Sequence, residues 1–320
     1  MSGPPSQGDD ESAGRLVYSL GSSPAERDRL RRQSGELRDH SALLLDRVGV
    51  AEGWQAVDLG CGPSGILDLL ADRVGPAGRV IGLDFEPANV ALAREFTAER
   101  GLANVEVVQG DARSTGFPSA FYDLVHARTL LINVPDPATV VAEMVRLARP
   151  GGWVAVLEPD VGGSVCYPAH PAWDRLTQIF LSAQQVDGAD TFIGRRLPEL
   201  FRQAGLVDIG AEAKADIYPA GYSRRTIRAD LVRSMRPKIL AAGIASESEL
   251  DEVDRAVREH LSDPDTLMLP HLLFLAWGRK PADAAAGPLA GQRAADLRPG
   301  LIRGRSTLRP GAGRSGRRCP

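Results

Sequence analysis

The chain has 320 residues, 43% of them apolar, which is enough for one large α/β domain with insertions or for two small domains. Its formal net charge of −3 argues against a polyanion as the partner of the whole chain. Three widely spaced cysteines predict neither a disulfide framework nor a zinc site and favour a reducing compartment. No apolar run reaches membrane-spanning length, and the polar first ten residues do not resemble a signal peptide, so a cytoplasmic location is expected.

The two ends of the chain are predicted to be disordered. Residues 1–14 are polar, and residues 281–320 are rich in Ala, Gly, Pro and Arg with few large apolar residues. One domain is therefore expected over residues 15–280. Its first part, residues 15–50, has leucines at helical spacing after a Ser-Pro helix start, which predicts one or two amphipathic helices.

A glycine-rich turn follows the first predicted strand. The apolar run 56–59 indicates a buried strand, Gly60, Gly62 and Gly65 follow it, and residues 66–74 have helical apolar spacing. A strand, such a turn and a helix form the first half of a nucleotide-binding βαβ unit, in which glycines let a ligand approach the backbone. Asp58 precedes the first glycine by two residues. Its carboxylate would repel a pyrophosphate and suits an ammonium or sulfonium group.

The next two predicted strands also end in acidic residues. Residues 79–84 form the second strand, and Asp84 lies about 20 residues beyond the glycine turn, where a carboxylate accepts hydrogen bonds from ribose hydroxyls. Phe85 is next to it and can pack on an adenine ring. A helix is expected over residues 87–100. The third strand, over residues 104–109, leads into the turn Gly110-Asp111-Ala112.

The second half of the chain starts regularly and then changes. A fourth strand is predicted over 121–126, a core helix around 140–147 and a fifth strand over 153–157 after the turn Arg149-Pro150-Gly151-Gly152. Beyond Asp160 the alternation of strands and helices breaks. The remaining predicted helices cover 172–186, 195–204, 224–240 and 246–261, and the remaining strands cover 206–217 and 268–277.

Taken in order, these motifs resemble those of the class I S-adenosylmethionine-dependent methyltransferases, most closely the ubiquinone-biosynthesis-type and bacterial small-molecule enzymes. The shared features are Asp-x-Gly-x-Gly-x-x-Gly, the acid of the second strand, Gly-Asp-Ala, the Tyr-Asp-Leu-Val strand and Arg-Pro-Gly-Gly. The resemblance implies a Rossmann-like, seven-stranded, mostly parallel sheet with helices on both faces. It also implies an N-terminal helical cap and helical insertions over about 165–195 and 222–262 that form a lid.

The resemblance implies S-adenosyl-L-methionine as the cofactor. The glycine turn would face the methionine part of the cofactor. Asp84 would bind its ribose and Asp111 its adenine, and the end of the fourth strand would lie next to its methyl group. The residues predicted to contact it are Asp58, Gly60, Cys61, Gly62, Gly65, Asp84, Phe85, Asp111, Ala112, Ala127 and Arg128, with Gln33 and Tyr18 from the cap.

The chemistry implied is in-line methyl transfer, which needs mainly alignment and exclusion of water. His126 and His170 are the candidate catalytic bases, and a packed or surface histidine is the competing interpretation of each. No metal site is predicted. The expected partner is a small-molecule acceptor methylated at oxygen, nitrogen or carbon in biosynthetic or secondary metabolism. No nucleic acid or membrane partner is expected, and a homodimer is a possible assembly.

Two other functions fit the same glycine turn. One is an NAD-dependent oxidoreductase, and the other is a cofactor-binding cyclase or regulatory module without methyl transfer. A cationic segment from Arg224 to Lys238 is expected to pair on the surface with the acidic residues 247–254. The alternative for this segment is that one arginine holds a carboxylate-bearing substrate.

Overall fold

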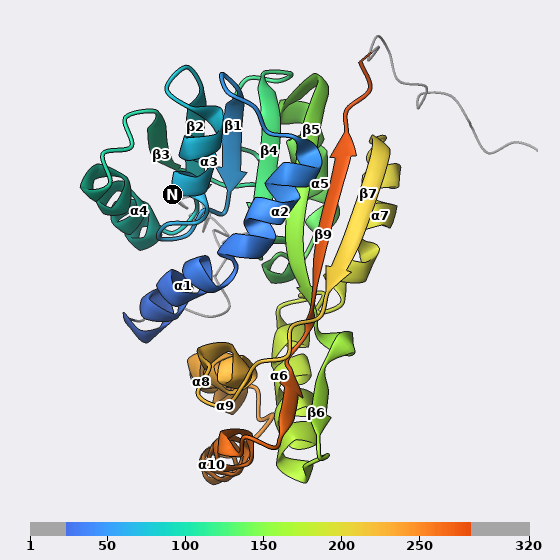
Figure 1. The fold of residues 1–320 in the computed structure, drawn as a ribbon. Helices are drawn as coiled ribbons and strands as arrows, with labels where there is room; N and C mark the ends of the chain where they lie inside the picture. Colours follow the sequence, from blue (N-terminus) through green and yellow to red (C-terminus); the bar gives the residue numbers. More distant parts are fainter. Residues whose placement is uncertain (1–23, 283–320) are drawn as a thin grey trace, which may run out of the picture. The chain divides into compact units, whose positions relative to one another are not determined.

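The computed structural model describes residues 24–282, which are built around one seven-stranded sheet (Figure 1). The strand order is β3-β2-β1-β4-β5-β9-β7, and β9 runs antiparallel to both of its neighbours while the other strands are parallel. The strands are β1 (Gln55–Leu59), β2 (Arg79–Asp84), β3 (Val105–Gln109), β4 (Tyr122–Arg128), β5 (Ala148–Asp160), β7 (Val207–Lys214) and β9 (Leu272–Arg279). This arrangement confirms the expected Rossmann-like, mostly parallel sheet.

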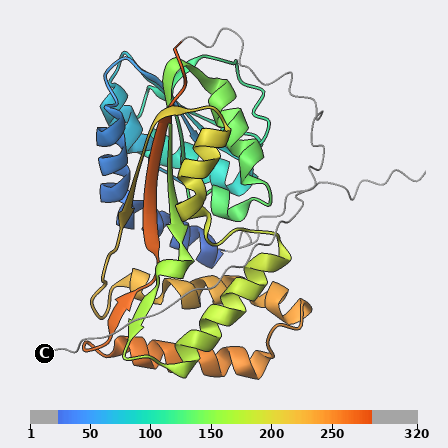
Figure 2. The same ribbon diagram turned by 90° about the vertical axis from the view of Figure 1, so that its right-hand side faces the viewer.

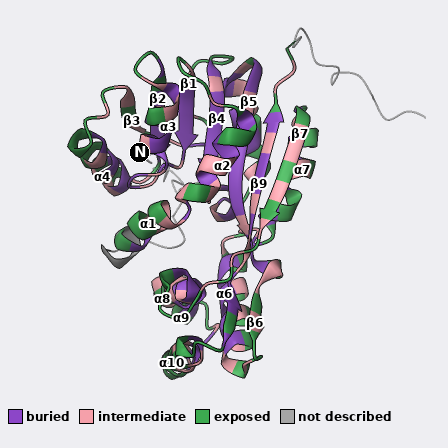
Figure 3. Cartoon of the chain, in the orientation of Figure 1, coloured by how far each residue is buried: buried purple, intermediate pink, exposed green. Residues whose placement is uncertain are grey.

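Helices cover both faces of the sheet, so its central strands are buried (Figure 3). Helices α2 (Arg38–Val48), α3 (Leu67–Val74) and α4 (Pro87–Glu99) pack on one face. Helices α5 (Pro137–Leu147) and α7 (Ile193–Gln203) pack on the other. The side chains of β1 therefore alternate between two apolar cores, with Val57 and Leu59 facing α5 and Ala56 facing α2 and α3.

A second group of helices lies beyond the carboxyl ends of the parallel strands (Figures 1 and 2). It contains α6 (Pro171–Val186), α8 (Ile227–Ser234), α9 (Arg236–Ala241) and α10 (Glu247–Ser262), with a small sheet of β6 (Val165–Tyr167) and β8 (Leu267–Leu269). These elements share a third apolar core. We call this group the lid. Helix α1 (Pro24–Glu36) precedes α2, and these two helices are the described part of the N-terminal cap expected over residues 15–50.

Proline explains two differences from the predicted elements. The strand expected over 268–277 is divided at Pro270 into β8 and β9, because proline has no N–H to donate to a ladder. The helix expected over 224–240 is divided at Met235 into α8 and α9 after a short 3-10 turn (Ser223–Thr226). Pro237 cannot donate to the carbonyl of Arg233, so the helix cannot run through.

The predicted disordered ends, residues 1–14 and 281–320, lie outside the described residues except for Pro281 and Ala282. Across residues 24–282, every helix is too short or too polar to span a bilayer. The same residues contain no group of three or more His, Cys, Asp or Glu side chains arranged to bind a metal ion.

The loop after β3 is held in place by a carboxylate of α5. Glu143 accepts hydrogen bonds from the backbone N–H and the hydroxyl of Thr115, at 2.9 and 2.6 Å, and from Arg146 Nε at 2.6 Å. The Arg146 guanidinium, with the Thr115 donors, lowers the pKa of Glu143 to about 2. Charged Glu143 therefore stabilises the fold and fixes the segment that leads away from Asp111.

We expect Glu143→Gln to lower the free energy of unfolding by about 2–3 kcal/mol at neutral pH. Because the folded-state pKa lies below the ordinary value, this contribution is complete above about pH 5 and is lost as the pH falls toward 2. Denaturant unfolding at several pH values should show the difference between variant and wild type narrowing as the pH falls. The exposed Glu95→Gln is the control, and a difference independent of pH would contradict the assignment.

Candidate functional site

A cavity of about 190 Å³ lies between the carboxyl ends of the parallel strands and the lid. One water needs about 10–15 Å³ of such space, so the cavity is large enough for an organic ligand. Its sheet side is lined by Gly60, Gly62, Leu83, Asp84, Phe85, Glu86, Asn89, Gly110, Asp111, Ala112, Arg113, Arg128, Thr129, Leu130, Ile132, Asn133, Val134, Pro159 and Val161. Its other side is lined by Arg29, Leu30, Gln33, Phe180, Gln184, Arg224, Ile227, Arg228, Leu231, His271 and Leu273.

The glycine turn brings bare backbone to the cavity. Gly60 and Gly62 have φ of +70° and +58°, in the left-handed region that favours glycine. A Cβ on Gly60 would come within 2.9 Å of Leu130 Cδ1, whereas a Cβ on Gly62 would meet no protein atom within 4 Å. The space beside Gly62 therefore belongs to the cavity, and a ligand can approach the main chain there.

Asp84 is fixed at the cavity wall by three N–H donors. Its carboxylate accepts from the backbone N–H of Gly62 at 2.8 Å and of Glu86 at 2.9 Å, and from Asn89 Nδ2 at 3.2 Å. Burial raises the pKa of Asp84, and these donors act in the opposite direction. A preorganised carboxylate next to open backbone suits the hydroxyls of a ribose.

The wall continues from Asp84 to Asp111 through the exposed ring of Phe85. Arg113 donates to both oxygens of Asp111, from Nε to Oδ1 at 3.2 Å and from Nη2 to Oδ2 at 2.7 Å, and these bonds lower the pKa of Asp111. The apolar side chain of Ala112 lies beside it. A carboxylate that stays charged next to apolar surface suits a nucleobase, whose ring is flat and whose amino group donates.

Four of the predicted cofactor residues lie behind this wall and do not line the cavity: Asp58, Cys61, Gly65 and Ala127. Asp58 was expected to meet a cationic group of the ligand, but in the structure its side chain is turned into the core. Its carboxylate, 2% exposed, accepts from His126 Nδ1 at 2.7 Å and from the Ile66 N–H at 3.5 Å. A Cβ on Gly65 would lie 2.5 Å from that carboxylate, so Gly65 is needed for close packing inside the turn.

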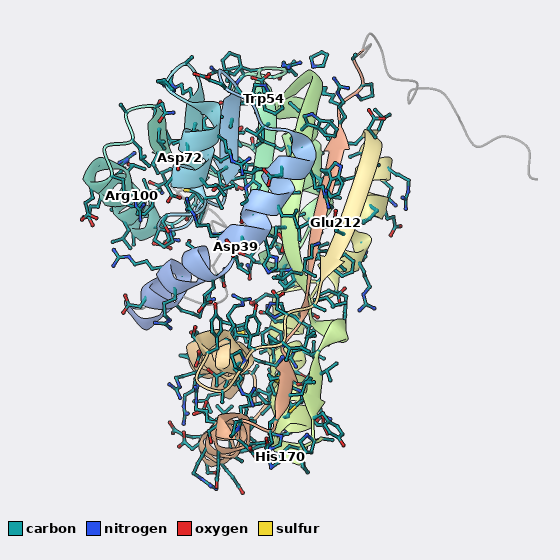
Figure 4. The ribbon with its side chains drawn as sticks, in the orientation of Figure 1. Asp39, Trp54, Asp72, Arg100, His170 and Glu212 are labelled. Atoms are coloured by element: carbon teal, nitrogen blue, oxygen red, sulfur yellow. The ribbon has the colours of Figure 1, made fainter. Side chains whose placement is uncertain are left out.

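The structure does not support either histidine as a catalytic base. His126 is fully buried between the sheet and its helices, paired with Asp58, its neighbour in the β1–β4 register. His170 lies at the end of the lid far from the sheet (Figure 4). Its Nδ1 accepts from the Ala172 N–H at 3.2 Å at the start of α6, and its ring stacks on His260 with centroids 4.5 Å apart. Neither side chain lines the cavity.

The end of β4 and helix α1 meet over the cavity. Gln33 Nε2 donates to Thr129 Oγ1 at 3.2 Å, and Arg128 donates to the Ser34 hydroxyl and the Gly65 carbonyl, both at 3.1 Å. Burial lowers the pKa of Arg128 to about 10. Thr129 has φ of +50°, an uncommon conformation for a β-branched residue. Gln33 and Arg128, two of the residues predicted to contact the cofactor, line the cavity, while Tyr18 lies outside the described residues.

A buried acid supports this turn from below and was missed by the sequence analysis. The Glu158 carboxyl accepts from the backbone N–H groups of Leu130 at 2.8 Å, Leu131 at 2.7 Å and Ile132 at 3.4 Å. Burial raises the pKa of Glu158 to about 8. The residue lies two positions before the end of β5 and directly follows the strand predicted over 153–157, and that position was the only sequence signal.

The sequence analysis expected a lid and considered one substrate-binding arginine between Arg224 and Lys238, but it did not identify which residues line the cavity. Arg224, Ile227, Arg228 and Leu231 line it at the i, i+3, i+4, i+7 spacing of one helix face, which is visible in the sequence. The prediction of surface ion pairs holds only further along the segment. Arg233 and Arg236 donate to Asp254 and Asp251 of α10, at 2.8 and 2.7 Å.

The fold and the cavity together define a nucleoside-binding α/β protein, and comparison with known proteins identifies its class. A family described as methyltransferase domain matches residues 51–202. Demethylmenaquinone methyltransferase of Anoxybacillus flavithermus is 34% identical over 182 residues, which cover 52% of this chain and 75% of that protein. Nocamycin O-methyltransferase of Saccharothrix syringae is 41% identical over 116 residues, 36% of this chain and 41% of that protein.

Solved structures agree on the fold. Phosphoethanolamine N-methyltransferase 2 of Haemonchus contortus superposes with a TM-score of 0.50 at 18% identity, covering 76% of this chain and 52% of that one. A candidate methyltransferase of Bacillus halodurans gives 0.51 at 18% identity, covering 75% and 98%. The chain belongs to the class I S-adenosyl-L-methionine-dependent methyltransferases. Its cofactor is S-adenosyl-L-methionine, and the NAD-dependent oxidoreductase considered for the glycine turn is wrong.

The cavity wall fits this cofactor. Gly60 and Gly62 present open backbone, Asp84 is oriented by three donors with room beside it, and Phe85 and Asp111 follow along the wall. We therefore propose that these residues, with Ala112, Gln33 and Arg128, hold the cofactor.

Replacing Gly62 by alanine tests the open backbone. We expect Gly62→Ala and Gly49→Ala each to cost about 1 kcal/mol of stability, because both glycines have positive φ and open space around the new Cβ. Gly49 ends α2 and does not line the cavity, so only Gly62→Ala should weaken S-adenosylhomocysteine binding, by at least about tenfold. Calorimetry measures both affinities. Equal affinities in the two variants would show that the ligand does not approach Gly62.

Asp84→Asn should lower the affinity for S-adenosylhomocysteine by about 10- to 100-fold, because a hydrogen bond to a charged group contributes about 1.5–3 kcal/mol. Asp72→Asn, at an exposed position of α3 (Figure 4), is the control and should bind as wild type does. Circular dichroism checks that both variants fold. Unchanged binding by Asp84→Asn would place the ribose elsewhere.

Proposed function

We propose that this methyltransferase acts on a small-molecule acceptor in biosynthetic or secondary metabolism. The acceptor would bind on the side of the cavity lined by α1, α6, α8 and the start of β9, which we call the lid half. The observation that carries the proposal is the cavity itself, which extends from the predicted cofactor wall to side chains of α1, α6 and α8. An acceptor placed between the wall and these helices would meet the methyl end of the cofactor. The names of the relatives given above specify demethylmenaquinone and nocamycin, both small molecules, which supports the proposal.

The chain's own residues would act by alignment and by exclusion of water. The cofactor supplies a methyl group already activated on a sulfonium. Apolar side chains of the lid half, Leu30, Phe180, Ile227, Leu231 and Leu273, surround the acceptor and keep water from competing as the nucleophile. The turn from Thr129 to Val134, held by Glu158, lines the sheet side of the cavity. Rigid walls on both sides hold the two reactants in line.

The cavity offers a poor proton acceptor near the lid. His271 accepts from Arg224 Nη2 at 2.8 Å through its Nε2, which places its proton on Nδ1. Burial, and then the Arg224 guanidinium, lower its pKa well below the ordinary histidine value. A neutral imidazole held in this way is a weak base, so the acceptor would enter methyl transfer already ionised or without needing to lose a proton.

The test is a methyl-transfer assay with methyl-labelled cofactor. We expect label to move to one compound when the protein is incubated with phenols, enols, carboxylic acids, amines and a small-molecule extract of the host. Asp84→Asn should reduce the transfer by at least about tenfold. Cofactor binding without any labelled product would favour a cyclase or a regulatory module. Label in protein or nucleic acid would overturn the small-molecule assignment.

A further inference from the structure

Two buried arginines and a glutamine of the lid have polar groups that the fold does not use. Arg224, Arg228 and Gln184 are 2–3% exposed, and all three line the cavity. Arg225, also buried, shows how this fold satisfies a purely structural arginine. It donates to four backbone carbonyls, those of Leu261, Tyr218, Asp263 and Thr266, and it does not line the cavity.

Arg224 is only partly satisfied. Its Nη1 donates to Glu36 at 3.3 Å and its Nη2 to His271 at 2.8 Å. Its Nε is buried without a hydrogen-bond partner. A buried N–H of a charged group without a partner is costly, so a ligand with an acceptor atom there would stabilise it.

Arg228 has no carboxylate partner. It donates to the Pro270 carbonyl at 2.6 Å, to Thr177 Oγ1 at 2.7 Å and to Ser164 Oγ at 3.4 Å, and it lies 4.4 Å from the centroid of the Trp173 ring. A guanidinium has five N–H groups, so two are left. Burial lowers the pKa of Arg228 to about 10, yet the group stays charged at neutral pH.

Gln184 supplies the opposite polarity. Its Oε1 is buried without a hydrogen-bond partner, and the residue lies one turn of α6 beyond Phe180, which also lines the cavity. A hydroxyl or N–H group of a ligand could donate a hydrogen bond to this unused acceptor and so stabilise the complex. The lid half thus offers a cationic donor pair and one neutral acceptor, surrounded by apolar side chains.

The charge in this half is positive. Among the described residues of α1, α6, α8 and β9 that line the cavity, none is an aspartate or glutamate. The carboxylate of Glu36 pairs with the Arg224 guanidinium and offsets the charge of Arg224. The charge of Arg228 has no such partner in the described structure. An anionic ligand would therefore be stabilised in this half of the cavity, and an ammonium group would be destabilised there.

We propose that the acceptor is a phenol or enol bound as its oxyanion, with the ionised oxygen at Arg224 and Arg228 and a second hydroxyl or N–H group at Gln184 Oε1. This inference rests on the proposed function. It names the substrate class that the cavity selects and the three residues that select it.

The reaction is then methylation at oxygen. The acceptor loses its proton to solvent as it binds, because two guanidinium groups favour its charged form. A lone pair of the oxyanion forms the new O–C bond while the electron pair of the S–C bond moves to sulfur. A negative acceptor and a positive sulfonium become a neutral ether and a neutral thioether. Methylation at a ring carbon would leave a further proton to remove, and His271 is a poor base for it.

The first experiment measures binding to the protein saturated with S-adenosylhomocysteine. The probes are 4-nitrophenol, its uncharged analogue 4-nitrotoluene and the amine 4-nitroaniline. We expect 4-nitrophenol to bind at least about tenfold more tightly than the other two, and absorbance titration to show its pKa lowered by about one to three units in the complex. Equal affinities with an unshifted pKa would overturn the inference.

Variants assign the effect to residues. Arg224→Gln and Arg228→Gln should each weaken 4-nitrophenol binding by at least about tenfold and reduce the pKa shift, with 4-nitrotoluene binding changed by less than about threefold. Arg175→Gln, a partly exposed lid arginine paired with Glu249 outside the cavity, is the control. Loss of 4-nitrophenol and 4-nitrotoluene binding to the same extent would overturn the assignment.

Gln184→Leu avoids any change of charge and keeps the side-chain volume. This variant should bind 4-nitrocatechol, which has a second hydroxyl, about tenfold more weakly than wild type, while its affinity for 4-nitrophenol stays unchanged. Equal binding of 4-nitrocatechol by variant and wild type would remove Gln184 from the proposal. Absence of S-adenosylhomocysteine binding would overturn the proposed function itself, whereas normal binding without selection of the phenolate overturns only this inference.

Discussion

The hydrogen bond from the Gly62 N–H to the Asp84 carboxylate ties the turn after β1 to the end of β2, and the rest of the site depends on it. The bond forms where residue 62 takes a left-handed conformation that favours glycine, and the absence of a side chain there exposes the main chain to the cavity. It also orients the carboxylate, whose other oxygen is held by Glu86 and Asn89. The same hydrogen bond thus fixes the backbone conformation of the turn and the orientation of the carboxylate that would bind the ligand. It joins residues only 22 positions apart.

This local origin explains why the sheet, the glycine turn and Asp84 could be predicted. Strand periodicity, glycine spacing and an acid at a strand end are all properties of short segments. Asp58 was placed correctly in β1, but its side chain points into the core. Whether it meets a ligand or His126 is decided by the β1–β4 register, which joins residues 68 positions apart. The sequence contains no local sign of that register.

The lid shows the same limit more strongly. Arg224 and Arg233 belong to one cationic segment, yet the first is buried in the cavity wall and the second pairs with Asp254 on the surface. What separates them is the position of Glu36 and His271, the partners of Arg224, which come from distant parts of the chain. Composition treats the two arginines alike, and the helical spacing of Arg224, Ile227 and Arg228 acquires meaning only once the lid is folded.

The way the chain passes between sheet and lid has a mechanical consequence. The chain passes between the sheet and the lid at four places: after β5, before α7, after β7 and before β9. The lid therefore has four covalent connections to the sheet and its helices. Helix α1, which also lines the cavity, joins the rest of the described chain only through Leu37. The position of α1 over the cavity therefore depends on the hydrogen bonds of Gln33, Ser34 and Glu36 rather than on several chain connections.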